Sequence, residues 1–552
     1  MHHQSAHQMP WTRYDRYDAA AALLLLVLVV LVLLTHDRYA VSNDEGLQQR
    51  YGELIISYYT SGFTDRSLFA FENLYLYGGL FDVTATLIGR ILPYDLYSIR
   101  HILCAATGIG GIVATWATAR LIAGARAGLI AAALLAVSGV WYGAMFNHTK
   151  DITFAAAMIG ATYALLRAMR DLPQPRLRHV LLFGVMLGAA LGLRATGLLL
   201  GIYLALAIVL KLCDNGGPAT HRERLAFATR SLLAFAPGLA LGYLIMIAAW
   251  PWAALDPLNP VRAIFAFAKF HYPIRDLLAG VVYAMDDMPR WYLPTYLAIK
   301  LPLAMLAGAA LALVVIAAPR PVRAEMPRRT RYEVMLVAAM AAFPIAAQVI
   351  SRGPEFSGMR HFTFVVPLLA VLAAFGFDTV IAAFGRWRTP AAAGAGVTIA
   401  MLVMWNAVTL ARLHPHEYLF YNPLVGGLPG AAGRYATDYW VNVMPEAVGK
   451  LEAFLTRMER DSGRSRGHYN VAICAQRLQF ERVSTDRLHW TDTWEEANFF
   501  ISPTHMSCDS MLEGKVIATI ERLGVVIGVV KDRRMLVDLE TAARIKTGRR
   551  QP

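Results

Sequence analysis

The chain has 552 residues, of which 57% are hydrophobic and only 16% charged, and its formal net charge is +13. A soluble domain carries about 25% charged residues, so this composition excludes an ordinary soluble protein. The basic residues gather in short loops between apolar runs, which is typical of a membrane protein and argues against nucleic acid as a partner.

Long uncharged runs predict about eleven transmembrane helices, because about 20 apolar residues cross the hydrocarbon core of a bilayer. The expected spans are 18–36, 97–119, 128–147, 152–169, 180–193, 195–211, 231–250, 296–318, 333–350, 362–384 and 391–411. The first run follows Arg13 and Arg16, as in a signal peptide, but no small-residue cleavage site comes after it. We therefore expect an uncleaved first helix.

Basic residues fall in alternate connections, which assigns these connections to one side of the membrane. They are Arg13/Arg16, Arg120/Arg126, Arg167/Arg170/Arg176/Arg178, Lys211/Arg222/Arg224/Arg230, Arg320/Arg323/Arg328/Arg329/Arg331 and Arg386/Arg388. Cytoplasmic loops are rich in Lys and Arg, so we expect an inner-membrane protein with a cytoplasmic N-terminus. The alternation requires two short helices that turn at Arg194, whereas one long helix over 180–211 would put this charge at the bilayer centre.

The connections on the opposite side are longer and more aromatic. The connection 37–96 interleaves tyrosine and phenylalanine with charged residues, which predicts one or two helices lying along the outer surface. From about residue 445 the composition changes to an amphipathic stretch and short β-like runs at 469–475, 497–501 and 525–530. These runs predict a small α/β domain.

The expected fold is therefore a polytopic α-helical membrane protein with a soluble α/β domain at its C-terminal end. We expect the membrane domain over 1–412 and the soluble domain over 413–552, on the periplasmic or extracellular side. Cys474 and Cys508 lie in this tail. An oxidising compartment permits a disulfide between them, but the sequence leaves that pairing open.

Acidic residues mark two of the outer connections. Asp44 and Glu45 come directly after the first span, where a carboxylate can take a proton from an acceptor hydroxyl. His148, Lys150 and Asp151 crowd the short turn between the third and fourth spans. The alternatives are a solvated loop for the first pair and a helix cap for Asp151.

Cations mark the other outer connections. Arg194 lies between two short helices with few polar neighbours, Lys300 begins a span, and Arg360 and His361 begin the tenth span. An anionic lipid phosphate is a natural partner for such cations, and the alternative is interfacial anchoring or snorkelling. Asp286 and Asp287 precede Lys300 in the loop 251–295.

All these residues map to the outer face of the predicted topology. Acids and bases converging there describe a site for a phosphate-bearing lipid and an acceptor that must be deprotonated. The sequence contains no Walker loop, no His-Glu-x-x-His and no Gly-x-Ser-x-Gly motif, so nucleotide-driven and protease chemistry lack support.

Several short strings resemble the GT-C glycosyltransferases, in particular the branch of protein O-mannosyltransferases and lipid A aminoarabinose transferases. They are Asp44-Glu45, Asn147-His-Thr-Lys-Asp151, Gly192-Leu-Arg-Ala-Thr-Gly197, Trp291-Tyr-Leu-Pro294 with Lys300-Leu-Pro302, Arg360-His-Phe with Pro367, and His414 to Asn422 with Gly426-Gly427 and Asp438-Tyr-Trp440. The resemblance covers about residues 40–440.

This resemblance implies transfer of a sugar from a polyprenyl-phosphate donor on the outer face, with inversion at the anomeric carbon. It implies that Asp44 is the catalytic base, with Asp151 as the second acid of the site and Glu45 beside the base. It also implies donor-phosphate contacts, for which Arg194, Lys300, Arg360 and His361 are the candidates. The candidates for other substrate contacts are His148, Lys150, Asp286 and Asp287.

Two further functions stay open at this stage. A transporter or flippase of a lipid-linked sugar would also place charges near the membrane, although it predicts mid-bilayer charges and repeat symmetry. A non-catalytic sensor is the third reading. The expected partners are the polyprenyl-phosphate donor, membrane lipids and an acceptor of unknown class; no residues with metal-ligand spacing stand out, and a divalent metal stays open as a cofactor.

Overall fold

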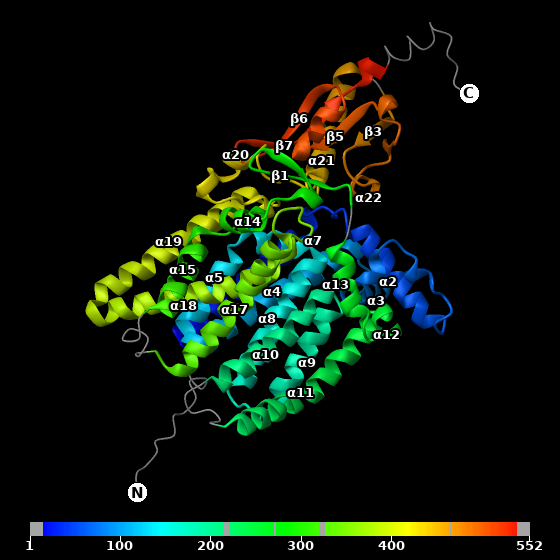
Figure 1. The fold of residues 1–552 in the computed structure, drawn as a ribbon. Coiled ribbons are helices and arrows are strands. Elements are labelled where there is room, and N and C mark those ends of the chain that lie inside the picture. Colours follow the sequence, from blue (N-terminus) through cyan, green and yellow to red (C-terminus); the bar gives the residue numbers. More distant parts are fainter. Residues whose placement is uncertain (1–14, 214–219, 270–271, 319–325, 464, 538–552) are drawn as a thin grey trace.

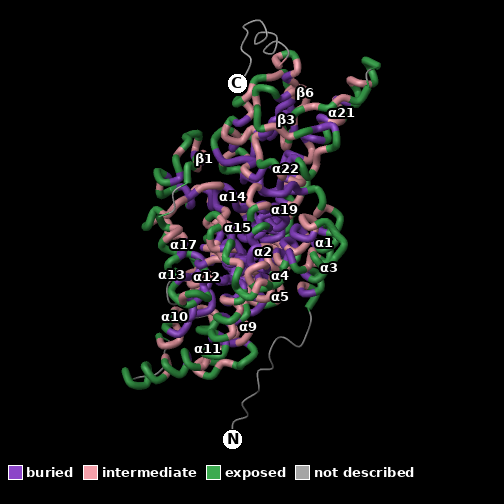
Figure 2. Tube along the Cα trace, turned by 90° about the vertical axis from the view of Figure 1, so that its right-hand side faces the viewer, coloured by how far each residue is buried: buried purple, intermediate pink, exposed green. Residues whose placement is uncertain are grey.

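The computed structural model describes residues 15–213, 220–269, 272–318, 326–463 and 465–537. A helical bundle forms the lower and central part of Figure 1, and a smaller domain containing a β-sheet stands at its upper end. One continuous hydrophobic core runs from the bundle into this domain, as the buried residues in the middle of Figure 2 show. The expected fold class, a helical membrane protein with a C-terminal α/β domain, is confirmed.

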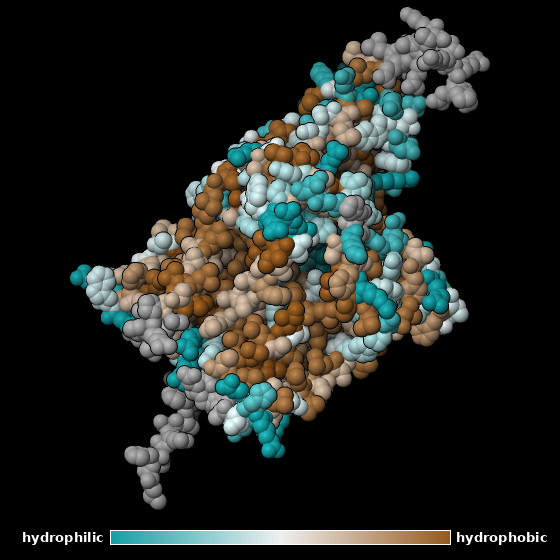
Figure 3. Space-filling model, viewed as in Figure 1, coloured by the Kyte–Doolittle hydropathy of each residue, from teal (hydrophilic) through white to brown (hydrophobic). Residues whose placement is uncertain are grey.

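Eight helices among the described residues are long and apolar enough to cross a membrane. They are α1 (Arg16–Thr35), α4 (Leu96–Ala123), α8 (Thr149–Met169), α10 (Leu199–Leu212) with the preceding η4 (Ala195–Leu198), α11 (His221–Ala249), α17 (Arg328–Ser351), α18 (Val366–Trp387) with the preceding η6 (Arg360–Val365), and α19 (Thr389–Leu413). Their apolar side chains cover much of the bundle surface in Figure 3, whereas hydrophilic side chains gather towards the C-terminal domain.

Two further apolar helix pairs are bent. Helix α5 (Ala125–Ala136) meets the short helices α6 (Gly139–Tyr142) and α7 (Ala144–Asn147) at 67°, and α14 (Tyr292–Lys300) meets α15 (Leu303–Ala317) at 114°. The second bend lies at Leu301-Pro302, where proline disfavours helical backbone in the residue before it and Leu301 is extended. Counting each pair as one span gives ten.

The one predicted span not yet accounted for, 180–193, corresponds to α9 (Leu177–Leu191). Its 15 residues reach only about 22 Å at 1.5 Å per residue, which is short of a hydrocarbon core of about 30 Å. The chain leaves helical geometry between α9 and η4, where Arg194 has an extended backbone. The chain therefore forms two helices, α9 and α10, and not one long helix over 180–211.

The outer connection 37–96 contains the two helices expected from its aromatic pattern, α2 (Glu45–Thr60) and α3 (Leu80–Ile91). The short turns η1 (His36–Arg38), η2 (Ser67–Phe69) and η3 (Leu74–Leu76) surround them. A small core of its own holds this segment together, formed by Tyr51, Leu54, Ile55, Leu68 and Leu74.

The connection between α11 and α14 contains helices and strands that were not predicted from the sequence. It contains α12 (Pro251–Leu255), α13 (Asn259–Ala268), an antiparallel hairpin of β1 (Arg275–Leu278) and β2 (Val281–Ala284), and the turn η5 (Met285–Asp287). Ala279 and Gly280 both have positive φ angles, as a two-residue hairpin turn requires.

After α19 the chain forms the short segments η7 (Glu417–Leu419), η8 (Pro423–Val425) and α20 (Gly427–Ala431) before the long helix α21 (Met444–Ser462). A five-stranded sheet follows, in the order β4-β3-β5-β7-β6. Its elements are β3 (Tyr469–Ile473), α22 (Arg477–Glu481), β4 (Leu488–Trp490), η9 (Trp494–Glu496), β5 (Phe499–Pro503), η10 (His505–Met511), β6 (Lys515–Arg522) and β7 (Val525–Asp532). Strand β3 pairs in parallel with β4 and β5, and β7 is antiparallel to β5 and β6.

The four cysteines divide between the two parts of the molecule. Cys474 and Cys508 form a disulfide that joins the end of β3 to η10. Cys104 is buried in the bundle and Cys213 is exposed at the end of α10. The pairing that the sequence left open is therefore present in the C-terminal domain.

Candidate active site

A cavity of about 290 Å³ lies where the bundle meets the C-terminal domain. Segments from most of the chain line it: the start of α2, the turn before η3, the N-terminal turn of α8, the residues before η4 and β1, the start of η6, and two residues of the C-terminal part. Its lining includes seven of the eleven residues proposed from sequence, namely Asp44, His148, Lys150, Asp151, Arg194, Arg360 and His361.

Asp44 and Arg360 form an ion pair across the cavity. The distance from Arg360 Nη1 to Asp44 Oδ2 is 3.2 Å. Asp44 occupies the N-cap position of α2, yet its carboxylate caps no N–H of that helix, and its side chain is 46% exposed. The Arg360 guanidinium is largely buried and lies 4.6 Å from the Trp440 ring and 5.1 Å from the Phe356 ring.

Asp151 and Arg194 form a second ion pair. Asp151 is buried in the first turn of α8, and Arg194 directly precedes η4. Tyr77 packs beside this pair, because its ring centre lies 4.2 Å from Lys150 Nζ and 6.0 Å from Arg194 Cζ. The N-cap residue of α8 is His148 rather than Asp151, and the hydrogen-bond partner of the Asp151 carboxylate is Arg194.

His148 is buried in the cavity wall, with 4% of its surface exposed. Neither ring nitrogen has a hydrogen-bond partner among the residues that the structure describes. Burial holds the pKa of this imidazole well below its usual value, and the charges of Arg360 and Lys300 lower it further. The neutral ring thus offers one N–H donor and one acceptor nitrogen to a ligand.

Lys300 lies behind this wall rather than in the central cavity. It lines an adjoining space of about 10 Å³, the size of roughly one water molecule, and this space shares His148 and Arg360 with the cavity. Lys300 is buried, donates a hydrogen bond of 2.8 Å to the Tyr418 carbonyl, and lies 3.9 Å from the Tyr421 ring centre.

Glu45 points away from the cavity and supports the loop that carries its neighbour. Its carboxylate accepts a hydrogen bond of 2.7 Å from Ser42 N and lies 3.7 Å from Arg100 Nε and 3.5 Å from His101 Nε2. Both Glu45 and Arg100 are fully buried. The structure therefore gives the adjacent acids different surroundings, since Asp44 faces the cavity and Glu45 faces the protein interior.

Asp286 and Asp287 are exposed on η5, and the described lining of the cavity includes neither residue. A different acid of the same connection is buried: Asp276 accepts hydrogen bonds from the Tyr292 hydroxyl and, at 3.2 Å, from Gly358 N. Asp276 thereby holds the turn that precedes Arg360. The substrate-contact assignment of the exposed pair finds no support in this geometry, because their side chains lie outside the cavity.

Several residues of the cavity wall were not proposed from the sequence, among them Tyr77, Asn147, Trp440 and Gln476. Asn147 and Trp440 belong to strings that resemble the GT-C family, but an aromatic or amide residue in a loop carries no further signal of its own. Arg100, which lies outside the described lining of the cavity, did carry a signal, because a charge inside the predicted span 97–119 requires a partner. That partner is Asp82 on α3, at 2.9 Å.

No group of three or more His, Cys, Asp or Glu side chains within the described ranges is arranged to hold a metal ion.

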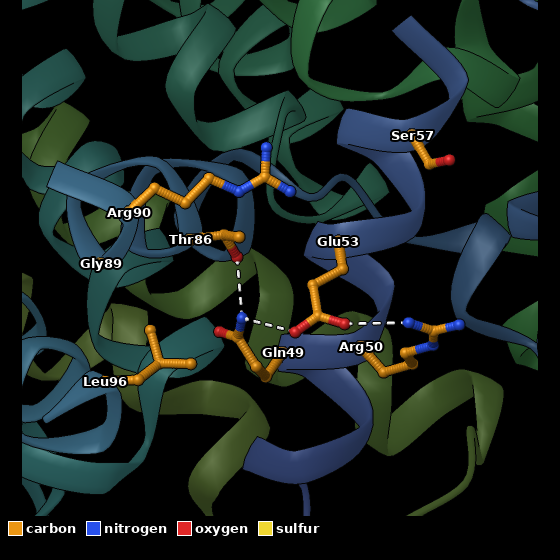
Figure 4. A pocket seen from close by; sticks show the side chains of 8 residues that line it. All are labelled: Gln49, Arg50, Glu53, Ser57, Thr86, Gly89, Arg90 and Leu96. Atoms are coloured by element: carbon orange, nitrogen blue, oxygen red, sulfur yellow. Dashed lines mark hydrogen bonds and ion pairs between the residues drawn. The ribbon is translucent and has the colours of Figure 1, made fainter. Parts of the chain in front are cut away.

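A separate surface cavity of about 370 Å³ lies between α2 and α3, and Figure 4 shows Glu53 in its wall between Gln49 and Arg50. Gln49 Nε2 donates to Glu53 at 3.3 Å and to Thr86 at 3.0 Å. The described residues that line this surface cavity contribute no unpaired buried side-chain atom, whereas several residues of the central cavity do.

Part of the chain is similar in sequence to a known protein family. Residues 83–246 match the family described as "Dolichyl-phosphate-mannose-protein mannosyltransferase". The matched range contains the turn from Asn147 to Asp151 and also Arg194. A comparison with curated protein sequences finds no match.

Three solved structures that are similar to this chain share 12–13% sequence identity with it. ArnT from Cupriavidus metallidurans bound to undecaprenyl phosphate is 13% identical, with 93% of this chain and 98% of that chain covered and a TM-score of 0.49. The oligosaccharyltransferase AglB from Archaeoglobus fulgidus, in complex with an inhibitory peptide and a dolichol-phosphate, is 13% identical (89% and 70% covered, TM-score 0.47). The arabinofuranosyltransferase AftD from Mycobacteria is 12% identical (92% and 40% covered, TM-score 0.42).

Proposed function

We propose that this chain, which belongs to the GT-C glycosyltransferase superfamily, transfers a sugar from a polyprenyl-phosphate carrier to an acceptor hydroxyl on the outer face of the bacterial inner membrane. The N-terminus would be cytoplasmic and the C-terminal domain periplasmic or extracellular. The basic loops described above support this orientation, since the described ones lie at the bundle end away from the cavity.

One observation carries the proposal: several buried polar atoms that line the cavity have no hydrogen-bond partner among the described residues. Within the described ranges, the unpaired atoms of lining residues are both ring nitrogens of His148, Nε of Arg194 and Arg360, Nε1 of Trp440 and Oδ1 of Asn147. An unsatisfied buried polar group costs about 1–3 kcal/mol. A ligand with several hydroxyls and a phosphate satisfies such a set, and a glycosyl phosphate has both.

The charges of the cavity also suit an anionic donor. Lys150, Arg194 and Arg360 face two acids in the central cavity, and Lys300 adds a further cation behind the wall. Each arginine uses one amino group on an acid and keeps a buried Nε–H unpaired among the described residues. A phosphate can therefore bind without breaking either ion pair, and fixed cations stabilise the charge that develops on a leaving phosphate.

Asp44 has the geometry of a general base. Its carboxylate faces the cavity and is half-exposed, so an acceptor hydroxyl can reach it. In the proposed step the acceptor oxygen attacks the anomeric carbon, its proton passes to Asp44, and the bond from that carbon to the phosphate oxygen breaks. The electron pair leaves with polyprenyl phosphate, whose charge Arg194 and Arg360 neutralise.

The discriminating experiment uses the purified full-length protein in lipid nanodiscs with a radiolabelled polyprenyl-phosphate sugar and membrane extract as acceptor source. Release of polyprenyl phosphate with transfer of label to an acceptor supports the proposal, and Asp44→Asn should abolish most of it. A flippase in proteoliposomes would instead move the intact lipid across the bilayer without releasing free carrier. That result would replace the transferase proposal.

A further inference from the structure

The C-terminal domain reaches into the cavity through the short helix α22, whose N-cap residue Gln476 forms part of the wall. We infer that Gln479 of this helix is a positioning residue that holds the Asp44 loop and Trp440 in their working geometry. This inference rests on the proposed function, because it assigns Gln479 an effect on the proposed base. It also gives the C-terminal domain a part in the transfer step.

The Gln479 amide is buried, at 2% exposure, and fully used. Its Nε2 donates hydrogen bonds to the carbonyl of Val41 at 2.7 Å and to the carbonyl of Trp440 at 2.8 Å. Its Oε1 accepts from the backbone N–H of Gln476 at 3.1 Å. Because two carbonyls face the NH₂ group and an N–H faces the oxygen, the orientation of the amide is determined by its partners.

The two carbonyls belong to segments that carry cavity groups. Val41 opens the loop that leads to Asp44, and this loop is also tied down where Ser42 Oγ donates to the Asn147 carbonyl at 3.1 Å. Trp440 lines the cavity and lies beneath Arg360, the partner of Asp44. One side chain of the C-terminal domain thus bonds both to the loop that carries Asp44 and to the residue whose ring packs against Arg360.

Packing around α22 leaves little room for the loop to move. A Cβ atom added at Gly46, in the first turn of α2, would lie 2.7 Å from Leu478 Cδ2. The base of α22 is anchored in the sheet, since Cys474 N donates to the Ile501 carbonyl at 3.0 Å and the Cys474–Cys508 disulfide follows directly after β3. The Gln479 amide therefore connects the Asp44 loop to a rigid element.

The test compares Gln479→Met, which keeps the volume and removes both donated hydrogen bonds, with Arg477→Met on the exposed face of the same helix. A displacement of about 1 Å at a reacting group can cost on the order of 100-fold in rate. We expect Gln479→Met to lower kcat by about 10- to 100-fold with the donor KM within about threefold of wild type, and Arg477→Met to leave both unchanged. In an Asp44→Asn background, Gln479→Met should cause no further loss of kcat.

A second measurement separates this inference from the proposed function. Hydrogen exchange of the amides in residues 42–46 should become faster in Gln479→Met, while exchange in β3, β5 and β7 stays at the wild-type rate. If the wild-type protein released no polyprenyl phosphate, the proposed transferase activity would be refuted. The exchange measurement would still test whether Gln479 holds the Asp44 loop in place. Unchanged exchange of the loop, or full kcat per folded Gln479→Met molecule, would overturn the inference.

Discussion

At the scale of single residues, the two cavity acids differ in ways that separate their roles. Asp44 is half-exposed and pairs with Arg360, whereas Asp151 is buried against Arg194. A base must reach the hydroxyl that it deprotonates, and Asp44 has the more accessible carboxylate. We propose that Asp151 instead orients the Arg194 guanidinium towards the donor phosphate.

We expect Asp44→Asn to lower turnover by about 10²–10⁴-fold, the usual contribution of a positioned base, while donor binding is kept. The asparagine preserves the size of the side chain and removes the proton acceptor. Turnover of labelled donor and binding of polyprenyl phosphate are measured on the same preparation. The control is Asp37→Asn, the same change at an exposed acid of the same connection, which should leave turnover unchanged. Near-normal turnover of Asp44→Asn would show that Asp44 is not the base.

Arg360→Ala should raise the KM for the donor lipid more than the KM for the acceptor. Truncating one partner of a buried charged contact costs about 2–5 kcal/mol, which corresponds to a rise of about 30-fold or more. Initial-rate kinetics with each substrate varied in turn measure the difference. The matched control is Arg290→Ala, at an exposed arginine three residues after η5. An unchanged donor KM in Arg360→Ala would show that Arg360 pairs with Asp44 but does not bind the donor.

Glu355, in the turn before Arg360, gives a prediction about pH. Burial raises the pKa of its carboxyl from 4.5 to about 8, against a smaller opposing effect of a hydrogen bond with Gln348. The folded state therefore binds more protons at this group than the unfolded state between pH 4.5 and 8, so its contribution to stability falls as the pH rises through that window. The slope is at most about 1.4 kcal/mol per pH unit.

Glu355→Gln cannot ionise, so the variant should lose less stability than wild type when the pH is raised from 5 to 8. Thermal unfolding of both proteins in the same detergent, followed at several pH values, measures this difference. Parallel profiles for the two proteins would show that Glu355 does not titrate in this window.

At the scale of elements, the starts of helices bring the cavity groups together. Asp44 precedes α2, Asp151 lies in the first turn of α8, and Arg360 opens η6. Carboxylates are favourable at helix N-termini because of the partial positive charge there. Burial of Asp151 is thus tolerated for a local reason as well as through its ion pair with Arg194.

The disulfide gives a prediction at this scale. Cys474 and Cys508 are 34 residues apart in sequence, and closing a loop of this size stabilises a domain by about 4 kcal/mol in the chain-entropy model. The double substitution Cys474→Ala with Cys508→Ala should therefore lower the unfolding temperature of the C-terminal domain and speed its proteolysis. The helical bundle should keep its resistance to protease.

Cys213→Ala, at the exposed cysteine outside this domain, is the control for loss of a thiol. Limited proteolysis with fragment mass spectrometry reports on both parts of the molecule at once. A C-terminal domain equally resistant in both variants would show that sheet packing alone stabilises it.

At the scale of the whole molecule, buried ion pairs lie near the two ends of the helical bundle. On α4, Arg100 pairs with Asp82 near one end and Arg120 pairs with Asp18 near the other. The two arginines are 20 positions apart, which is about 30 Å at 1.5 Å per residue and matches the thickness of the hydrocarbon core. The cavity lies at the Arg100 end, together with the C-terminal domain.

This arrangement predicts the orientation of the protein in the membrane. Alkaline phosphatase fused after Arg460 should be active, because the enzyme folds only outside the cytoplasm, and a fusion after Arg224 should be inactive. Fluorescent protein fused at the same two positions should give the opposite pattern and controls for expression. The reverse pattern of phosphatase activity would move the cavity to the cytoplasmic face and exclude the proposed orientation.

The sequence by itself determined the fold class, nearly every membrane helix and the existence of a C-terminal α/β domain. These features depend on local composition: an uncharged run must be helical in lipid because its backbone has no water to bond. Ten spans are counted among the described residues when each bent pair is one span, and the remaining expected span, 180–193, is the short helix α9. The 114° bend between α14 and α15 was not foreseen.

Only the tertiary structure decided which polar residues share the cavity. Asp44 and Arg360 are 316 positions apart, and no local pattern relates them. The docking of α2 turned Asp44 towards the cavity and Glu45 into the interior, and in the loop before α14 it was Asp276, rather than Asp286 or Asp287, that became buried. The reason is physical: hydropathy along the chain determines whether a segment enters the membrane, whereas the neighbours of a polar side chain depend on how distant segments pack.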